Sequence, residues 1–207
     1  HVAAWLHDCG KVTTPEYVVD KATKLETLYD RIHEVRMRFE VLKRDAEITS
    51  LKAVAAGEPE TTAMKNLAAT LAQIDDDYAF IATCNEGGEF MAPEKLERLK
   101  SIATRTWLRT LDDRIGISHE EKERKARTPP PALPIAEPLL ADRPDHVFDR
   151  RPQDRMAPDN KWGFRMPVPE LLYNKGELYN LGVARGTLAE EERYKINEHI
   201  VQTLIML

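Results

Sequence analysis

Six residues near the start of the chain, Leu6-His-Asp-Cys-Gly-Lys11, combine side chains that could bind a metal ion and a phosphate group. His7 and Asp8 are adjacent, and hard divalent metal ions prefer carboxylate oxygen and imidazole nitrogen as ligands. We expect an apolar helix to end at this pair. At a helix end two adjacent side chains can turn toward one point, which they cannot easily do in mid-helix. A bare His-Asp pair more often only ends a helix. The pair alone therefore does not assign a metal site.

A second candidate lies close to the other end of the chain. Thr187-Leu-Ala-Glu190 has the spacing of a capping box, in which a hydroxyl and a carboxylate satisfy the free amides at a helix start. It predicts a last helix whose apolar residues recur at helical spacing. These residues share one face, with His199 beside it: Ile196, Ile200, Thr203, Leu204 and Leu207.

Together the two motifs resemble those of a known enzyme family. Trp5-Leu-His-Asp-Cys-Gly-Lys-Val12 resembles the signature of the HD superfamily, in which the His-Asp pair binds metal. Residues 185–199 are similar to the segment of HD-GYP proteins that runs from a Gly-x-Leu-Thr-x-Glu-Glu turn to a metal-binding histidine. The resemblance implies that His7, Asp8 and His199 are metal ligands.

The resemblance also implies a function, namely a metal-dependent phosphohydrolase that cleaves cyclic di-GMP. Two or more divalent ions, iron or manganese, would activate a hydroxide, with Asp8 bridging two of them. Lys11 would bind the substrate and offset charge on its phosphate oxygens. Two alternatives stay open. One is an HD-type nucleotide phosphohydrolase, and the other is a catalytically vestigial signalling or dimerisation module that forms a homodimer through its helices.

The chain departs from the ordinary family pattern in its spacing. His199 lies 192 positions after His7, so we expect a large insertion between the two motifs. Residues 21–33 are a rough copy of the segment that leads to the family histidine, so His33 competes with His199 as third ligand. We favour His199, because residues 186–190 match more closely and the helix after them has a core-facing pattern.

Further ligands and the Gly-Tyr-Pro motif of the family are not found in the sequence. The first residues have the pattern of a helix interior, and the apolar last helix has no stop signal. We therefore expect a fragment of a longer protein, inactive when isolated.

The pattern of apolar residues predicts an all-α fold with an interrupted HD core. Residues 1–24 form the first part of that core, with a loop after the His-Asp motif, and residues 181–207 return to it. Residues 25–127 form an inserted helical region. Residues 128–180 form a proline-rich segment that packs on the surface in extended form.

Within the insertion, two helices over residues 25–56 and 60–82 share a seam of apolar residues and are joined at Gly57-Glu-Pro59. This arrangement predicts an antiparallel hairpin. A third helix is expected over residues 93–111. Ser118-His-Glu-Glu121 has capping-box spacing and predicts a short helix that ends near residue 127.

Composition narrows the functional classes. The net charge of −5 argues against nucleic acid as a partner. No apolar run approaches the roughly 20 residues that span a bilayer, so no membrane contact is expected from this segment. Two isolated cysteines favour a reducing compartment, and we expect a cytoplasmic protein.

Other polar residues are weaker candidates for a site. Surface or core roles are expected for His1, His119 and His146. The run Asp75-Asp-Asp77 lacks the glycine and distal glutamate of a calcium loop, so a solvated helix face is expected. A group of arginines could form an anion patch: Arg105, Arg109 and Arg114.

Overall fold

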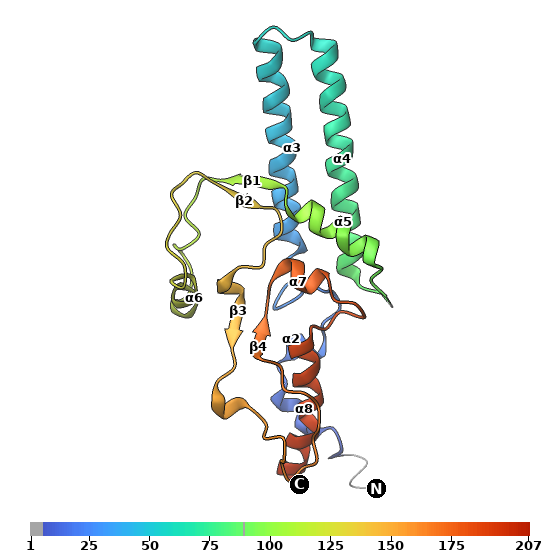
Figure 1. The fold of residues 1–207 in the computed structure, drawn as a ribbon, viewed down its shortest axis with the longest axis vertical. Helices are drawn as coiled ribbons and strands as arrows, with labels where there is room; N and C mark the ends of the chain where they lie inside the picture. The colour runs from blue at the N-terminus through green and yellow to red at the C-terminus, as the bar shows by residue number, and fades with distance from the viewer. Residues whose placement is uncertain (1–5, 89) are drawn as a thin grey trace.

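A long helical hairpin projects from one end of the protein (Figure 1). The computed structural model describes residues 6–88 and 90–207, so the expected helix at residues 1–5 lies outside the described residues. Helices α3 (Ile32–Ala55) and α4 (Glu60–Glu86) run antiparallel. Gly57 in the turn between them has φ +101°, a left-handed conformation that glycine adopts without steric cost. The predicted hairpin is confirmed.

Helix α3 starts later than the sequence pattern predicts. The segment before it is a turn in which Glu26 and Asp30 form an isolated bridge. The Asp30 Oδ1 accepts a hydrogen bond from the Ile32 amide at 2.9 Å, which satisfies a free donor of the first helical turn. Leu28, expected on the helical seam, is 92% exposed.

The hairpin joins the body of the protein through an apolar core at its base. Val35 and Phe39 of α3 are buried there with Ile74 and Ile81 of α4. The Phe39 ring meets the ring of Tyr78 edge to face, with 5.3 Å between centroids. Such a contact adds to the stabilisation from burial alone.

The third helix is shorter than expected. Helix α5 covers Pro93–Ala103, and the residues that follow form strand β1 (Thr106–Arg109). Strand β1 pairs antiparallel with β2 (Ile135–Pro138), with Trp107 opposite Glu137. The prediction of a helix over residues 93–111 is wrong beyond Ala103, because pairing with a distant segment overrides the local pattern.

Helix α6 (His119–Lys125) begins where its cap predicts. The Ser118 Oγ accepts a hydrogen bond from the Glu121 amide at 3.2 Å. The helix ends two residues earlier than expected.

Part of the proline-rich segment packs on the body. Leu139 and Leu140 are buried in the core. The segment also contains regular structure, namely β2, the 3₁₀ turns η2 (Pro144–His146) and η3 (Pro152–Asp154), and β3 (Val147–Asp149). Strand β3 pairs antiparallel with β4 (Leu171–Asn174). The protein is therefore mostly helical with a few short strands, and the expectation of an all-α fold is inexact.

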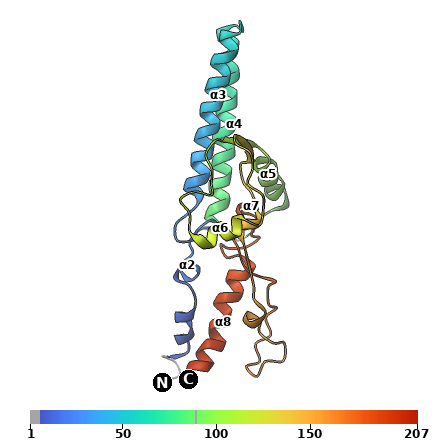
Figure 2. The same ribbon diagram turned by 90° about the vertical axis from the view of Figure 1, so that its left-hand side faces the viewer.

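The first and last segments lie side by side (Figure 2). Residues expected to form a loop instead contain the 3₁₀ turn η1 (Cys9–Thr13) and the short helix α2 (Glu16–Val19). Helix α8 (Glu190–Met206) lies against both, and α7 (Glu177–Leu181) precedes it. No helix in the described ranges is both long and apolar enough to cross a membrane.

Helix α8 is capped differently from the prediction. The Thr187 hydroxyl donates to the carbonyl of Lys21 at 3.2 Å and does not cap the helix. The Glu192 carboxylate instead accepts from the Ala189 amide at 2.9 Å. Alanine offers no side-chain acceptor, so only the carboxylate half of a capping box is present.

Two ion pairs of low exposure connect distant segments. The Lys21 Nζ lies 2.8 Å from a carboxylate oxygen of Glu192, which joins the first segment to α8. The Arg38 guanidinium binds both oxygens of Glu177 at 2.8 and 2.9 Å, which joins the hairpin to α7. A bidentate arginine–carboxylate pair fixes the orientation of both side chains.

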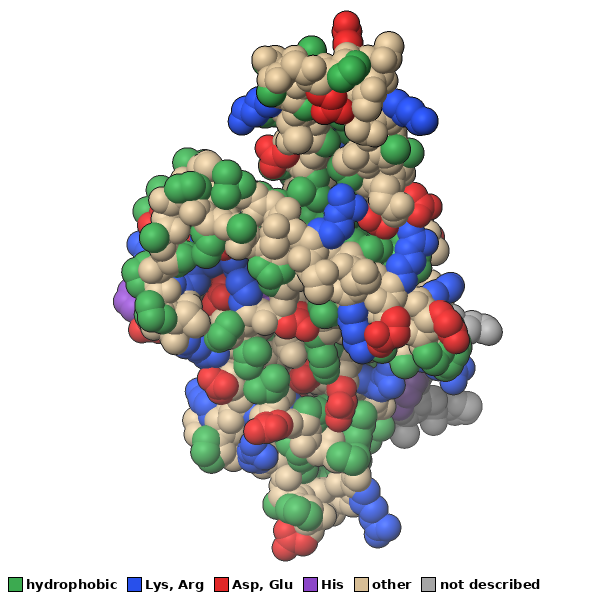
Figure 3. Space-filling view, turned by 45° about the horizontal axis from the view of Figure 1, so that its top comes forward, with side chains coloured by type: hydrophobic (Ala, Val, Ile, Leu, Met, Phe, Trp, Pro, Cys, Tyr) green, Lys and Arg blue, Asp and Glu red, His purple; other side chains and the backbone are tan. Residues whose placement is uncertain are grey.

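On the face in Figure 3, acidic and basic side chains are interspersed over the hairpin and the body. Across the hairpin, Lys43 of α3 and Asp75 of α4 form an ion pair at 2.8 Å.

Candidate metal and phosphate site

Gly10 allows the N-terminal turn to approach helix α8 closely. The Gly10 amide donates a hydrogen bond to the Thr203 Oγ1 at 2.9 Å. A Cβ atom at position 10 would lie 2.1 Å from the His199 carbonyl oxygen and 2.5 Å from the Thr203 nitrogen. Only glycine fits here without a shift of the backbone. The contact brings the residues before η1 to the side of α8.

Asp8 precedes η1, and three basic side chains surround its carboxylate. The His199 Nε2 lies 3.3 Å from Asp8 Oδ1, and the His7 Nε2 lies 3.3 Å from Asp8 Oδ2. The Lys11 Nζ lies 2.7 Å from the same Oδ2. The structure therefore brings together all four residues that the sequence singled out as ligands or phosphate-binding groups.

These neighbours lower the pKa of the Asp8 carboxyl. The hydrogen bond from Lys11 is the main cause, and the charges of His7, Lys11 and His199 act in the same direction. Partial burial acts in the opposite direction. Asp8 is consequently held in its ionised form, which is the form that binds metal.

A contact of the His199 Nδ1 atom with the backbone orients the imidazole ring, so that Nε2 faces Asp8. This Nδ1 is in hydrogen-bond contact with the Ile196 carbonyl oxygen. A carbonyl can only accept, so Nδ1 carries the proton. The Nε2 atom is then the ring nitrogen that faces the Asp8 carboxylate. At this position it can pair with the carboxylate or share a cation with it.

The ligand atoms of this site are of the types that bind a divalent metal ion. Asp8 offers carboxylate oxygen, and His7 and His199 offer imidazole nitrogen. The geometry falls short of a closed site, because no three His, Cys, Asp or Glu side chains within residues 6–88 and 90–207 are arranged to hold an ion. The His7 side chain is 68% exposed.

His33, the competing third ligand, has a different setting. It lies in the first turn of α3, and its Nδ1 contacts the Arg36 guanidinium at 2.8 Å. Asp8 approaches His199 at 3.3 Å, as predicted, and the role of His199 as third ligand stays a prediction.

The weaker histidine candidates stay apart from this site. His119 is exposed and pairs with Glu123 at 3.5 Å. His146 is half-buried in η2, and its Nδ1 accepts from the Arg143 amide at 3.3 Å. His1 lies outside the described residues.

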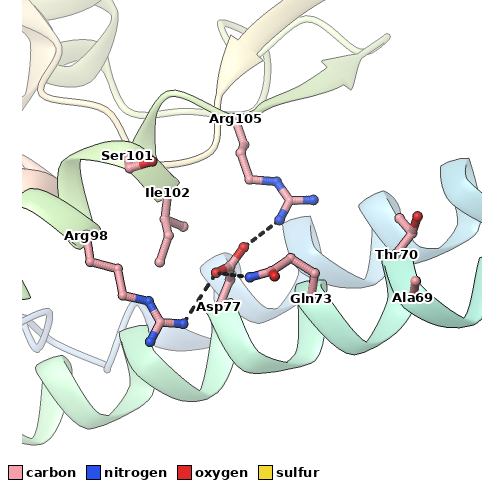
Figure 4. A pocket seen from close by; sticks show the side chains of 8 residues that line it. All are labelled: Ala69, Thr70, Gln73, Asp77, Arg98, Ser101, Ile102 and Arg105. Atoms are coloured by element: carbon pink, nitrogen blue, oxygen red, sulfur yellow. Dashed lines mark hydrogen bonds and ion pairs between the residues drawn. The ribbon is translucent and has the colours of Figure 1, made fainter.

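Asp77 contradicts the expectation of a solvated acidic face. It is 5% exposed and borders a cavity of about 680 Å³ between α4 and α5 (Figure 4). The Arg105 guanidinium lies 2.5 Å from Asp77 Oδ2, and the Gln73 amide donates to Oδ1 at 3.0 Å. Arg98 reaches Asp77 Oδ1 at 3.5 Å. The run of three aspartates did not indicate that Asp77 is buried, because its arginine partners lie more than 20 positions away along the chain.

The arginines considered as an anion patch each have a separate partner. Arg105 binds Asp77, Arg109 binds Glu137 at 2.8 Å, and Arg114 donates to the Thr128 carbonyl at 2.9 Å. The patch is therefore not formed.

Comparison with known proteins supports one family. A family model described as the HD domain matches residues 134–207, somewhat more than a third of the chain. The match includes His199 but not His7 and Asp8. It supports an HD-domain phosphohydrolase, a class that is in general metal-dependent. No curated protein and no solved structure matches the chain.

Proposed function

We propose that this chain is part of a metal-dependent phosphodiesterase that hydrolyses cyclic di-GMP. His7, Asp8 and His199 would bind metal, and Lys11 would bind the substrate phosphate. The observation that carries the proposal is the 3.3 Å contact between a carboxylate oxygen, Asp8 Oδ1, and an imidazole nitrogen, His199 Nε2. The HD-domain match over residues 134–207 and the His-Asp motif support the same class.

The four residues have separate tasks in this proposal. The carboxylate of Asp8 supplies negative charge that attracts a divalent ion, and the imidazoles of His7 and His199 add nitrogen donors. An ion bound by these residues would supply a hydroxide at neutral pH. Lys11 holds its ammonium group 2.7 Å from Asp8, so its positive charge is close to any phosphate that reaches the ion.

The number of donors limits what residues 1–207 can do alone. Three side chains can hold one ion with open positions, whereas chemistry of the HD-GYP type uses at least two. We therefore propose that further ligands come from outside these residues. The isolated chain is expected to bind metal weakly and to leave cyclic di-GMP intact.

Calorimetric titration of the isolated chain with Mn²⁺ tests the ligand assignment. Weak binding should be lost in Asp8→Ala and in His199→Ala and retained in His33→Ala, the matched control. Loss of binding in His33→Ala, with binding retained in His199→Ala, would show that the wrong histidine was chosen.

The substrate assignment needs a direct comparison of nucleotides. The longer protein that contains this chain should release linear dinucleotide from cyclic di-GMP. If it instead hydrolyses only mononucleotides, the HD-type nucleotide phosphohydrolase is the correct alternative.

The projecting hairpin favours a second candidate, a dimerisation module with a vestigial site. Several large apolar side chains on its surface are exposed: Met37, Ile48, Leu51 and Met64. Ile48 and Leu51 are three positions apart and so lie on one side of α3, and apolar side chains that form a contiguous exposed patch mark interaction sites. Sedimentation equilibrium of the chain and of Leu51→Glu tests it. A dimer that Leu51→Glu dissociates, purified without iron or manganese, would favour the module over the enzyme.

A further inference from the structure

A cleft of about 460 Å³ lies between the η3 loop and helix α8. Its loop side carries Arg150, Arg151 and Arg155, and its helix side carries Lys195. Two carboxylates, Asp154 and Glu198, also line it. Its volume is in the range of small-molecule sites. In a chain of net charge −5, this concentration of cations is unusual.

Two of the four cations are neutralised by neighbours. Arg151 binds Asp154 at 2.8 Å, and Lys195 binds Glu198 at 2.9 Å. Arg150 and Arg155 form no ion pair with any carboxylate in the described part of the chain. The cleft therefore keeps an excess of two positive charges.

Arg150 is held rigidly by neutral acceptors. It is 9% exposed, and its guanidinium donates to the carbonyls of Pro169, Asp154 and Leu171 at 3.0, 3.3 and 3.2 Å. Its central carbon lies 4.9 Å from the ring centroid of Tyr194. A nearly buried charge that forms no ion pair costs free energy, which an anion in the cleft would offset.

Arg155 is positioned to move toward a ligand. Its side chain is exposed, and its one hydrogen bond recorded among described residues is a long contact of 3.5 Å to the Glu170 carbonyl. The amides of Gln153 and Gln202, which also line the cleft, can donate hydrogen bonds to an oxyanion.

We propose that this cleft binds the phosphate group of a small phosphorylated molecule. Arg150 supplies a fixed positive charge, and Arg155 supplies a guanidinium fork that matches phosphate oxygens. The site is separate from Asp8 and does not depend on the function proposed above. Helix α8 lies between the N-terminal segment and the loop that carries the arginines (Figure 2).

Titration with inorganic phosphate, at constant ionic strength set by chloride, tests the proposal. Calorimetry should show saturable binding at one site. Arg155→Gln should weaken it about tenfold, because a charge-assisted hydrogen bond is lost. Arg165→Gln is the matched control, since Arg165 is exposed on the same segment but does not line the cleft. Absence of saturable binding, or equal affinities for the two variants, would overturn the proposal.

Two further measurements test whether the cleft recognises the phosphate group of a ligand, and whether the cleft is distinct from the site at Asp8. Adenosine monophosphate should bind and adenosine should not, because the cleft recognises charge. Binding of phosphate should also persist in Asp8→Ala. Equal binding of adenosine and its monophosphate, or loss of phosphate binding in Asp8→Ala, would contradict a separate phosphate cleft.

Discussion

The imidazole Nε2 of His199 lies 3.3 Å from the Oδ1 of Asp8, so a contact between side chains links the first and last segments of the chain. The backbone of Gly10 supports this contact by packing on Thr203, 193 positions away. The candidate site therefore depends on the docking of η1 against α8.

Gly10→Ala should destabilise this docking. The added Cβ would meet backbone atoms of His199 and Thr203 at 2.1 and 2.5 Å, so η1 and α8 must separate. We expect a loss of about 1–3 kcal/mol in the free energy of unfolding, typical of overpacking. Urea unfolding measures it. Gly88→Ala is the control, because a Cβ there has open space. Equal stability of the two variants would contradict the observed packing.

Lys21→Met should be strongly destabilising, because it leaves the Glu192 carboxylate nearly buried without a cation. Their side chains are only 1% and 9% exposed, and breaking such a pair costs about 3–5 kcal/mol. Lys43→Met, which breaks an exposed pair with Asp75, should lower the stability much less. Thermal unfolding compares the two, and a similar loss in both would show that the pair of Lys21 and Glu192 is not buried in solution.

His146 should make the protein less stable in acid. Burial, with the nearby charge of Arg143, lowers its pKa from 6.5 to about 4. The unfolded chain then binds a proton that the folded chain does not, so stability falls as pH decreases from about 6.5 to 4. The contribution is about 2–3 kcal/mol. Urea unfolding of His146→Gln should show a smaller loss over this range, whereas the exposed His119→Gln should behave like the unaltered protein. An unchanged pH dependence in His146→Gln would refute this.

Lys11→Ala should slow phosphodiester hydrolysis in the longer protein without removing metal. In the proposed function its ammonium group would offset charge on the substrate and would not hold the ions, so turnover should fall on the order of a hundredfold. Metal content measured in the same samples should stay unchanged. Loss of metal in this variant would give Lys11 a role in maintaining the metal site.

Local sequence patterns predict the elements that depend on near neighbours. The hairpin turn at Gly57 and the Ser118 cap are examples, because spacing within one or two helical turns determines both. Strand β1 and the burial of Asp77 were not predictable in this way. Their partners, Glu137 opposite Trp107 and Arg105 beside Asp77, lie about 30 positions away along the chain.

The candidate site was predictable for a different reason. Neither spacing nor periodicity relates Asp8 to His199, and only the resemblance of two motifs to one family connected them. The contact of Lys11 with Asp8 follows from a separation of three residues. No motif or short spacing in the sequence relates Lys21 to Glu192, so their buried ion pair is evident only in the folded structure.

Metal content and cyclic di-GMP hydrolysis test the central claim most directly. Both are measured in a protein that joins this chain to the further ligands proposed above, and in its Asp8→Ala variant. We expect the unaltered protein to contain iron or manganese and to release linear dinucleotide. Asp8→Ala should lose both properties while keeping its circular-dichroism spectrum, because the Asp8 side chain adds little to the core. Full activity in Asp8→Ala would contradict the assignment of this chain to an HD-type metal-dependent phosphodiesterase.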